Sequence, residues 1–244
     1  MRWIYLSPHL DDAILSCGGL IYHQTQDGIP VEIWNLMSGT PSADAPLSEL
    51  ACKVHVGWGT ASAKETLMLR LAEDHLAAQR VGATPRYFDF LDCIYRNDTD
   101  GTPLYTDDIF VPPHIADAML IEQIAQSLRE TLCADDVLVC PLTIGNHPDH
   151  VIVRDAVERT GNLLCYYADI PYAMWHPEQF TEIVENLSAS SYPITEEEML
   201  VWQDAIAVYA SQIEVLFGTE EMMRTGIELY WQVNCGIQLW RPGE

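Results

Sequence analysis

Residues 3–26 read WIYLSPHLDDAILSCGGLIYHQTQ, and this stretch sets the pattern from which the fold is predicted. It opens with a short apolar run at 3–6, which indicates a buried strand. A polar turn follows at 7–12, and apolar residues then recur at helical spacing through 13–26, in spite of a pair of glycines. The stretch therefore predicts a strand, a turn and a helix in succession.

The same alternation continues to about residue 165. We expect further strands at 31–37, 86–90, 137–140 and 163–167, and helices at 61–81, 115–132 and 150–159. Connections of this length join parallel strands through helical crossovers. The predicted fold class is therefore α/β, with a mostly parallel sheet that is covered by helices on both faces.

Two regions depart from this alternation. Residues 38–60 are rich in Ser, Gly, Pro and Ala and show no period, which predicts a long loop of the kind that is more often functional than idle. After residue 165 we expect a strand at 182–185, a helix at 196–216 and a final strand at 229–239.

The length and the apolar fraction fit one large domain. The chain has 244 residues, of which 48% are apolar, enough for a sizeable core. We expect a single domain over 1–244 in which 168–244 are C-terminal additions; a boundary near residue 168 is the alternative.

The charge of the chain bears on its partners. Lys and Arg number 12 against 36 Asp and Glu, so the net charge is −24. Such a surface repels phosphate backbones and anionic lipids, so we expect neither a nucleic-acid nor a membrane partner. Neutral or cationic substrates are favoured.

Cysteine usage and the apolar runs indicate the compartment. The seven cysteines are scattered and never in CxxC spacing, which is typical of reduced thiols rather than of a disulfide framework. No apolar run approaches the ~20 residues of a membrane span. The N-terminus goes directly into the first strand, which leaves no room for a signal peptide. A cytoplasmic location is the expectation.

Two polar motifs directly follow predicted strands. The first is SPHLDD at 7–12, and the second is GNHPDH at 145–150, after the strand VLVC. Open α/β sheets bind ligands outside the carboxyl ends of their strands. Both motifs lie at such ends, so we expect them to converge and to form the functional site.

The converged motifs would provide a metal site. His9, Asp12 and His150 offer two imidazoles and a carboxylate, a set that suits one Zn²⁺ per chain with a position left open for water. Bound zinc lowers the pKa of that water towards ~7 and polarises a substrate carbonyl. This chemistry predicts a hydrolase.

Three further residues of the motifs have candidate roles. Asp11 is placed to take a proton from the water as general base, and His147 to stabilise the oxyanion or to protonate the leaving amine. Asp149 is a candidate for a residue that does not bind the metal but accepts a hydrogen bond from a ligand imidazole and orients it. Asp11 and Asp12 also suit a helix N-cap, and Pro148–Asp149 suits a helix start, so each motif alone has an ordinary structural explanation. The two motifs together favour the metal site.

The two motifs also carry a resemblance. SPHLDDAILSCGG and GNHPDHVIVRDA resemble the two characteristic motifs of the PIG-L/LmbE-like N-acetylglucosaminyl deacetylases. Similarity extends to the helix around Arg70, to the loop at Asp92 and to Tyr209–Gln212, and covers most of residues 3–215. Leu10 and Ala13 depart from the usual Pro and Glu, which suggests a subgroup with a different substrate.

The resemblance implies a zinc-dependent de-N-acylase with a Rossmann-like α/β fold. It implies the same roles for the metal ligands His9, Asp12 and His150, for the general base Asp11 and for His147. Arg70 and Asp92 fall where family members contact sugar hydroxyls. The implied reaction removes an N-acyl group, expected to be acetyl, from an amino sugar or sugar conjugate.

Two other functions stay open. One is a metal-dependent ester or phosphoester hydrolase, although the chain shows one apparent metal site and no basic cluster for phosphate. The other is a non-catalytic carbohydrate-binding relative, against which the presence of Asp11 and His147 argues. Tyr172, Trp175 and Tyr166–Tyr167 are candidates for a sugar-stacking wall or for plain core packing. The sequence leaves a homo-oligomer open.

Overall fold

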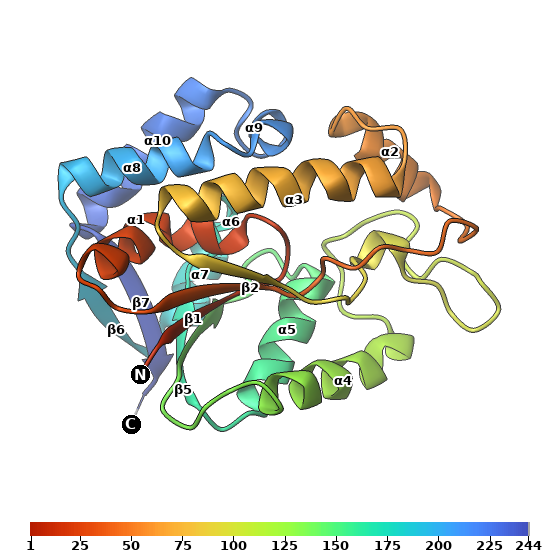
Figure 1. The fold of residues 1–244 in the computed structure, drawn as a ribbon, viewed down its shortest axis with the longest axis horizontal. Coiled ribbons are helices and arrows are strands. Elements are labelled where there is room, and N and C mark those ends of the chain that lie inside the picture. The colour runs from red at the N-terminus through yellow and green to blue at the C-terminus, as the bar shows by residue number, and fades with distance from the viewer. Residues whose placement is uncertain (244) are drawn as a thin grey trace.

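A mixed sheet forms the middle of the molecule, and the computed structural model describes it within residues 1–243 (Figure 1). Its seven strands are β1 (Trp3–Ser7), β2 (Val31–Asn35), β3 (Thr84–Tyr87), β4 (Val137–Pro141), β5 (Leu163–Tyr167), β6 (Leu187–Tyr192) and β7 (Ile237–Pro242). They lie in the order β3-β2-β1-β4-β5-β7-β6. The first five are parallel, and β7 runs antiparallel to both of its neighbours.

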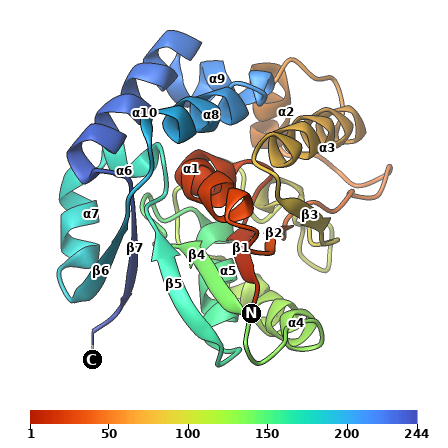
Figure 2. The ribbon, with the colours of Figure 1, turned by 60° about the vertical axis from the view of Figure 1, so that its left-hand side comes forward.

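Helices cover both faces of this sheet (Figure 2). One face carries α1 (Asp12–Gln26), α3 (Ala63–Arg80), α8 (Glu196–Ile206) and α10 (Glu220–Asn234). The other carries α4 (Ala118–Arg129), α5 (Pro148–Glu158) and α7 (Pro177–Val184). The remaining helices are α2 (Glu49–Gly57), α6 (Tyr172–Trp175), α9 (Ala210–Phe217) and the 3₁₀ turns η1 (Cys93–Tyr95) and η2 (Ile115–Asp117). The expected α/β class is confirmed.

The strands are apolar on both sides because each side packs against helices. In β1, Tyr5 belongs to the core under α1, whereas Ile4 and Leu6 belong to the core over α5. All three side chains are buried. A parallel strand that is buried on both faces is a nearly continuous apolar run, which is why these strands are visible in the sequence.

The position of the site follows from the strand order. From β1 the chain proceeds to β2 and β3 on one side of the sheet, and to β4 and β5 on the other. The connections after β1 and β4 therefore diverge, and they leave a crevice at the carboxyl ends of these two neighbours. The two polar motifs follow these two strands.

The expected long loop at 38–60 is partly wrong, because it contains α2. This helix begins after Ser48, whose side chain accepts a hydrogen bond from the backbone N–H of Ala51. Small and polar residues concealed its period. The strand expected at 86–90 also lies earlier than predicted, at 84–87.

Three expectations after residue 165 are wrong. Residues 182–184 belong to α7, and the strand follows them as β6, because a short apolar run does not distinguish a strand from a helix. Residues 196–216 form two helices, α8 and α9, with a break before Ala210. Most of 229–239 is the end of α10, which stops where Cys235 and Gly236 have φ of 52° and 137°. Only the last residues of that range belong to β7.

No helix among residues 1–243 is long and apolar enough to cross a membrane.

Candidate active site

The turn between β1 and α1 is held by its own polar side chains. Ser7 Oγ donates to the carbonyl of His9 at 2.6 Å and accepts from the N–H of Ala13 at 3.0 Å. Asp12 Oδ2 accepts from the N–H of His9 at 2.7 Å. Asp11 occupies the N-cap position of α1, but its side chain makes no capping hydrogen bond. Helix capping therefore does not explain this carboxylate.

The second motif begins α5. Gly145 and Asn146 have φ of 89° and 58°, which turns the chain sharply after β4. Pro148 is the first residue of α5, where its missing N–H costs no hydrogen bond. His147 Nδ1 accepts from the backbone N–H of Asp149 at 3.2 Å. This motif does start a helix, and its capping residue is His147.

The two motifs meet, as their positions at neighbouring strand ends predict. The carboxylate of Asp12 lies 3.3 Å from His9 Nδ1 and 3.3 Å from His150 Nε2. The ring of His147 lies 4.7 Å from that of His9 and 5.3 Å from that of His150, measured between centroids. One nitrogen of each of these three histidines lies within 4.8 Å of the other two. The structure thus places the ring of His147 beside the three predicted ligands.

These residues fit a divalent cation. His150 Nε2 is buried, and Asp12 Oδ1 lies 3.3 Å from it without the geometry of a hydrogen bond, so a cation between the two atoms would satisfy both. His150 Nδ1 lies 2.7 Å from Asp169 Oδ1, so the carboxylate orients the ring and directs Nε2, rather than Nδ1, towards the place where a metal ion would bind. Two imidazoles and a carboxylate form the donor set of a zinc site with an open position.

Asp149 lies behind the first histidine. Its Oδ2 is 3.0 Å from His9 Nε2 and accepts the N–H of Cys93 at 2.9 Å. Its other oxygen accepts from the guanidinium of Arg96, which also binds Asp117. Asp149 is fully buried, and its contact with His9 is the one that the orienting role requires.

Asp11 faces a cation rather than the helix. Arg70 Nη2 donates to Asp11 Oδ2 at 3.2 Å, and the guanidinium carbon lies 4.6 Å from the ring centroid of Trp58. Burial raises the pKa of Asp11 to about 6, although the charge of Arg70 opposes this rise. Asp11 therefore holds a proton more readily than an ordinary aspartate does, as a general base near neutral pH requires.

The two histidines of the second motif have opposite environments. Burial lowers the pKa of His147 well below its ordinary value, and the nearby charge of His9 lowers it further. Burial also acts to lower the pKa of His150, but the carboxylates of Asp12 and Asp169 raise it to about 9. Because His147 Nδ1 accepts a hydrogen bond, its neutral ring carries the proton on Nε2. This imidazole can donate to a developing oxyanion.

Asp92 lies beside His9. Its Oδ1 accepts the N–H of Ile94 at 3.1 Å, which caps η1, and its Oδ2 lies 3.8 Å from His9 Nε2. Both Asp92 and Arg70 line the cavity above the site. A polar ligand in the cavity can reach both of them.

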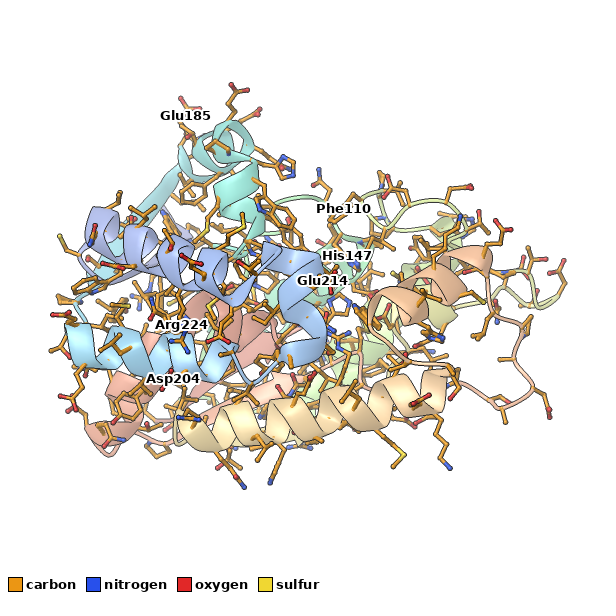
Figure 3. The ribbon with its side chains drawn as sticks, turned by 90° about the horizontal axis from the view of Figure 1, so that it is seen from above. Phe110, His147, Glu185, Asp204, Glu214 and Arg224 are labelled. Carbon is orange, nitrogen blue, oxygen red and sulfur yellow. The ribbon has the colours of Figure 1, made fainter. Side chains whose placement is uncertain are left out.

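The cavity has a polar floor and apolar walls. Its volume is about 210 Å³, and its floor contains His9, Asp11 and Asp12. Phe110 packs edge-on against His147 with 6.1 Å between the ring centroids, and Figure 3 labels both. The other apolar wall residues include Trp58, Ile94, Tyr172, Trp175, Val215 and Leu216. Tyr172 and Trp175 thus lie where a stacking wall requires, whereas Tyr166 and Tyr167 belong to β5 and do not line the cavity.

Sequence reasoning missed three residues of the site. Asp169 orients His150, and its signal was an aspartate two positions after the end of β5. Arg96 holds Asp149, and Trp58 lies under Arg70. The last two are isolated in the sequence, so no local pattern identifies them.

The chain is similar to known deacetylases. The sequence model of the PIG-L family, described as GlcNAc-PI de-N-acetylase, matches residues 4–160. A 2'-N-acetylparomamine deacetylase of Niallia circulans is 25% identical in an alignment of 269 positions, gaps included, that covers 98% of this chain and 93% of that protein.

Crystal structures extend the similarity to the whole fold. The zinc-inhibited form of the teicoplanin deacetylase Orf2 superposes with a TM-score of 0.87 and 27% identity, covering 98% of this chain and 97% of that one. The A40926 pseudoaglycone deacetylase Dbv21 gives a TM-score of 0.75 and 28% identity, covering 99% and 96%.

Proposed function

This chain belongs to the PIG-L family of GlcNAc-PI de-N-acetylases, and on that premise we propose a zinc-dependent hydrolase that removes an acetyl group from an amino sugar in a conjugate. The observation that carries the proposal is the convergence of His9, Asp12 and His150, in which Nε2 of His150 is buried and makes no hydrogen bond although Asp12 lies 3.3 Å away. The relatives named as deacetylases support the same reaction class, and their named substrates are glycosides or glycopeptides.

His9, Asp12 and His150 would hold one Zn²⁺. When bound, this ion polarises the scissile carbonyl and lowers the pKa of a water molecule beside it. Asp149 and Asp169 keep the imidazoles of His9 and His150 in the orientation that this binding needs.

Two side chains would handle the protons. Asp11 takes a proton from the attacking water, and Arg70 fixes the carboxylate in the direction of the cavity. His147 donates a hydrogen bond from Nε2 to the carbonyl oxygen as negative charge develops there, or protonates the departing amine. Each role is worth about 10²- to 10⁴-fold in rate.

Arg70 and Asp92 would bind hydroxyl groups of the sugar. Arg70 Nε is buried and has no partner in the structure, so it is free to donate to a ligand oxygen. Tyr172 and Trp175 offer ring faces on which the apolar side of a pyranose packs.

A screen of bond types tests the proposal. Metal-replete protein is incubated with N-acetylglucosamine glycosides, the matched O-acetyl esters and the matched phosphoesters, and released acetate, amine and phosphate are measured. We expect acetate and amine in equal amounts from the amides. Release from esters or phosphates alone would establish the other hydrolase, and no release from any class would favour a binding protein. The cytoplasmic location stays an expectation from the cysteine pattern.

A further inference from the structure

A buried arginine lies between the proposed metal site and the outer wall of the cavity. Arg96 directly follows η1, and its Nη1 donates to Asp149 Oδ1. The other oxygen of that carboxylate lies 3.0 Å from His9 Nε2. With a carboxylate on Nε2, the Nδ1 atom of His9 faces Asp12, 3.3 Å away, where the proposed ion would bind. Arg96 thus supports, through one residue, the orientation of a proposed metal ligand.

The other edge of the same guanidinium holds a second carboxylate. Arg96 Nη2 donates to Asp117 Oδ2 at 3.1 Å, and Nε lies 3.0 Å from Asp117 Oδ1. The hydroxyl of Tyr105 donates to Asp117 Oδ2 at 2.6 Å and accepts the backbone N–H of His114 at 2.8 Å. Both aspartates that Arg96 contacts are buried. One planar cation therefore binds two buried carboxylates with different edges, which the single ammonium of a lysine cannot reproduce.

This second contact anchors the segment 97–113, which forms part of the cavity wall. Residues 97–113, all of them described by the structure, form neither a helix nor a strand, and among them only Tyr105 is buried. Ile109 and Phe110 line the cavity. Phe110, labelled in Figure 3, packs edge-on against Tyr172 with 5.6 Å between the ring centroids. A segment with so few buried side chains depends on its anchor for its position.

We propose that Arg96 is a positioning residue that couples metal binding at His9 to the ordering of the segment 97–113 over the cavity. The proposal rests on the proposed zinc site. When His9 binds the ion, its imidazole is fixed and Asp149 with it, and Arg96 extends this constraint to the anchor of the segment through charge-assisted hydrogen bonds. The ordered wall then binds substrate more tightly. Because such coupling is reciprocal, loosening the anchor also weakens zinc binding.

Hydrogen exchange measures this coupling without turnover. In the wild type, saturating zinc should slow the exchange of backbone N–H groups in 97–113. In Arg96→Lys zinc still binds at saturation, but the ammonium keeps only one carboxylate, so the protection of the segment should be lost. Residues 42–47, another segment without helix or strand, should exchange alike in all samples. Equal protection in the two proteins, or no protection in the wild type, would overturn the proposal.

Two variants separate the two edges of the guanidinium. Arg96→Lys should raise the Kd of zinc by about 10- to 100-fold, as the loss of support for a metal ligand does. Tyr105→Phe removes the hydroxyl that binds Asp117 and keeps the ring. It should raise both the Kd of zinc and the KM of an N-acetylglucosaminide by about fivefold, and KM more than it changes kcat. Zinc affinity unchanged in Tyr105→Phe would contradict the coupling, and this variant decides alone if Arg96→Lys does not fold.

The matched control is Arg2→Lys. Arg2 also binds two carboxylates, those of Asp136 and Glu32, and it precedes β1, at the end of that strand opposite the first motif. This substitution should leave the zinc affinity and the protection of 97–113 as in the wild type. Loss of either in Arg2→Lys would show that any buried arginine has the same effect and that the site of Arg96 is not special.

These readouts separate the inference from the proposed function. If no compound releases amine, but zinc protects 97–113 and Arg96→Lys abolishes the protection, the coupling stands and the deacetylase function fails. If amine is released and Tyr105→Phe changes neither KM nor the Kd of zinc, the function stands and the coupling fails. A wild type that binds no zinc would overturn both.

Discussion

At the scale of single residues, the buried pair of Asp11 and Arg70 decides whether the site can do acid–base chemistry. Asp11 is not one of the proposed metal ligands, and it makes no capping hydrogen bond. Its partner is Arg70, at 3.2 Å. If this carboxylate transfers a proton and does not bind the metal, a substitution of Asp11 should lower turnover without changing the metal content.

Asp11→Asn keeps the size of the side chain and removes the base. We expect turnover to fall by about 10²- to 10⁴-fold, while the zinc content stays that of the wild type. Steady-state kinetics and metal analysis on one preparation measure both. The control is Asp44→Asn, an exposed carboxylate remote from the motifs in sequence. Undiminished turnover in Asp11→Asn would exclude Asp11 as the base.

Asp169 should act through His150. Asp169→Ala removes the carboxylate that orients the ring, so we expect zinc affinity to weaken by about 10- to 100-fold. Competition with a chromophoric chelator measures this affinity, and circular dichroism checks the fold. Asp155→Ala, on the same helix as His150 but outside the site, is the control. Equal affinity in the two variants would remove Asp169 from the site.

At the scale of elements, the contact between α1 and α8 explains why α1 contains two adjacent glycines. A Cβ atom on Gly18 would lie 2.5 Å from Trp202 Cδ1, and one on Gly19 would lie 2.5 Å from Ile194 Cδ1. Trp202 is fully buried, and its indole N–H donates to the carbonyl of Ile14 at 2.8 Å. The pair of glycines lets α8 approach α1, which carries Asp12 at its first position.

Two alanine substitutions test this contact, because they should change the free energy of unfolding in opposite directions. Gly18→Ala overpacks a fixed indole ring, so the free energy of unfolding should fall by about 1–3 kcal/mol. Gly226→Ala, in the interior of α10 with room for a methyl group, should raise it by up to about 1 kcal/mol. Urea denaturation measures both. Equal effects of the two substitutions would show that helix propensity, and not the α1–α8 contact, is what matters.

The elements also show how far the sequence predicts this molecule. The units β1–α1 and β4–α5 were predictable because a buried strand, a polar turn and a periodic helix lie within about 25 residues of each other. The end of α10 was not, because it depends on Cys235 adopting a left-handed conformation that few non-glycine residues favour. The antiparallel pairing of β6 with β7 joins distant segments, and no local pattern specifies it.

The same distinction holds for the site. His9, Asp11, Asp12, His147, Asp149 and His150 lie in two short motifs at strand ends, so their convergence was predictable. Asp169, Arg96 and Trp58 are single residues that the fold brings to the motifs from elsewhere. Their contribution depends on tertiary structure, which local patterns do not record.

At the scale of the whole molecule, a bound ion would tie together the connections after β1 and β4. Removing it with a chelator should lower the melting temperature. With free zinc at about 100 times Kd the ion adds about 2.7 kcal/mol, which corresponds to roughly 5–10 °C for a chain of this size. Zinc added back should restore the difference, and His150→Ala should show no response to either treatment. A melting temperature that the chelator leaves unchanged would contradict a site shared by the two connections.

The zinc content of the purified chain, measured alongside Asp12→Ala and His150→Ala, shows whether the two motifs bind one metal ion. If the carboxylate and the imidazole that lie 3.3 Å apart bind one ion, the wild type should carry about one zinc per chain and both variants should lose it. Folded variants that keep the zinc content of the wild type would show that the two motifs do not bind the metal together.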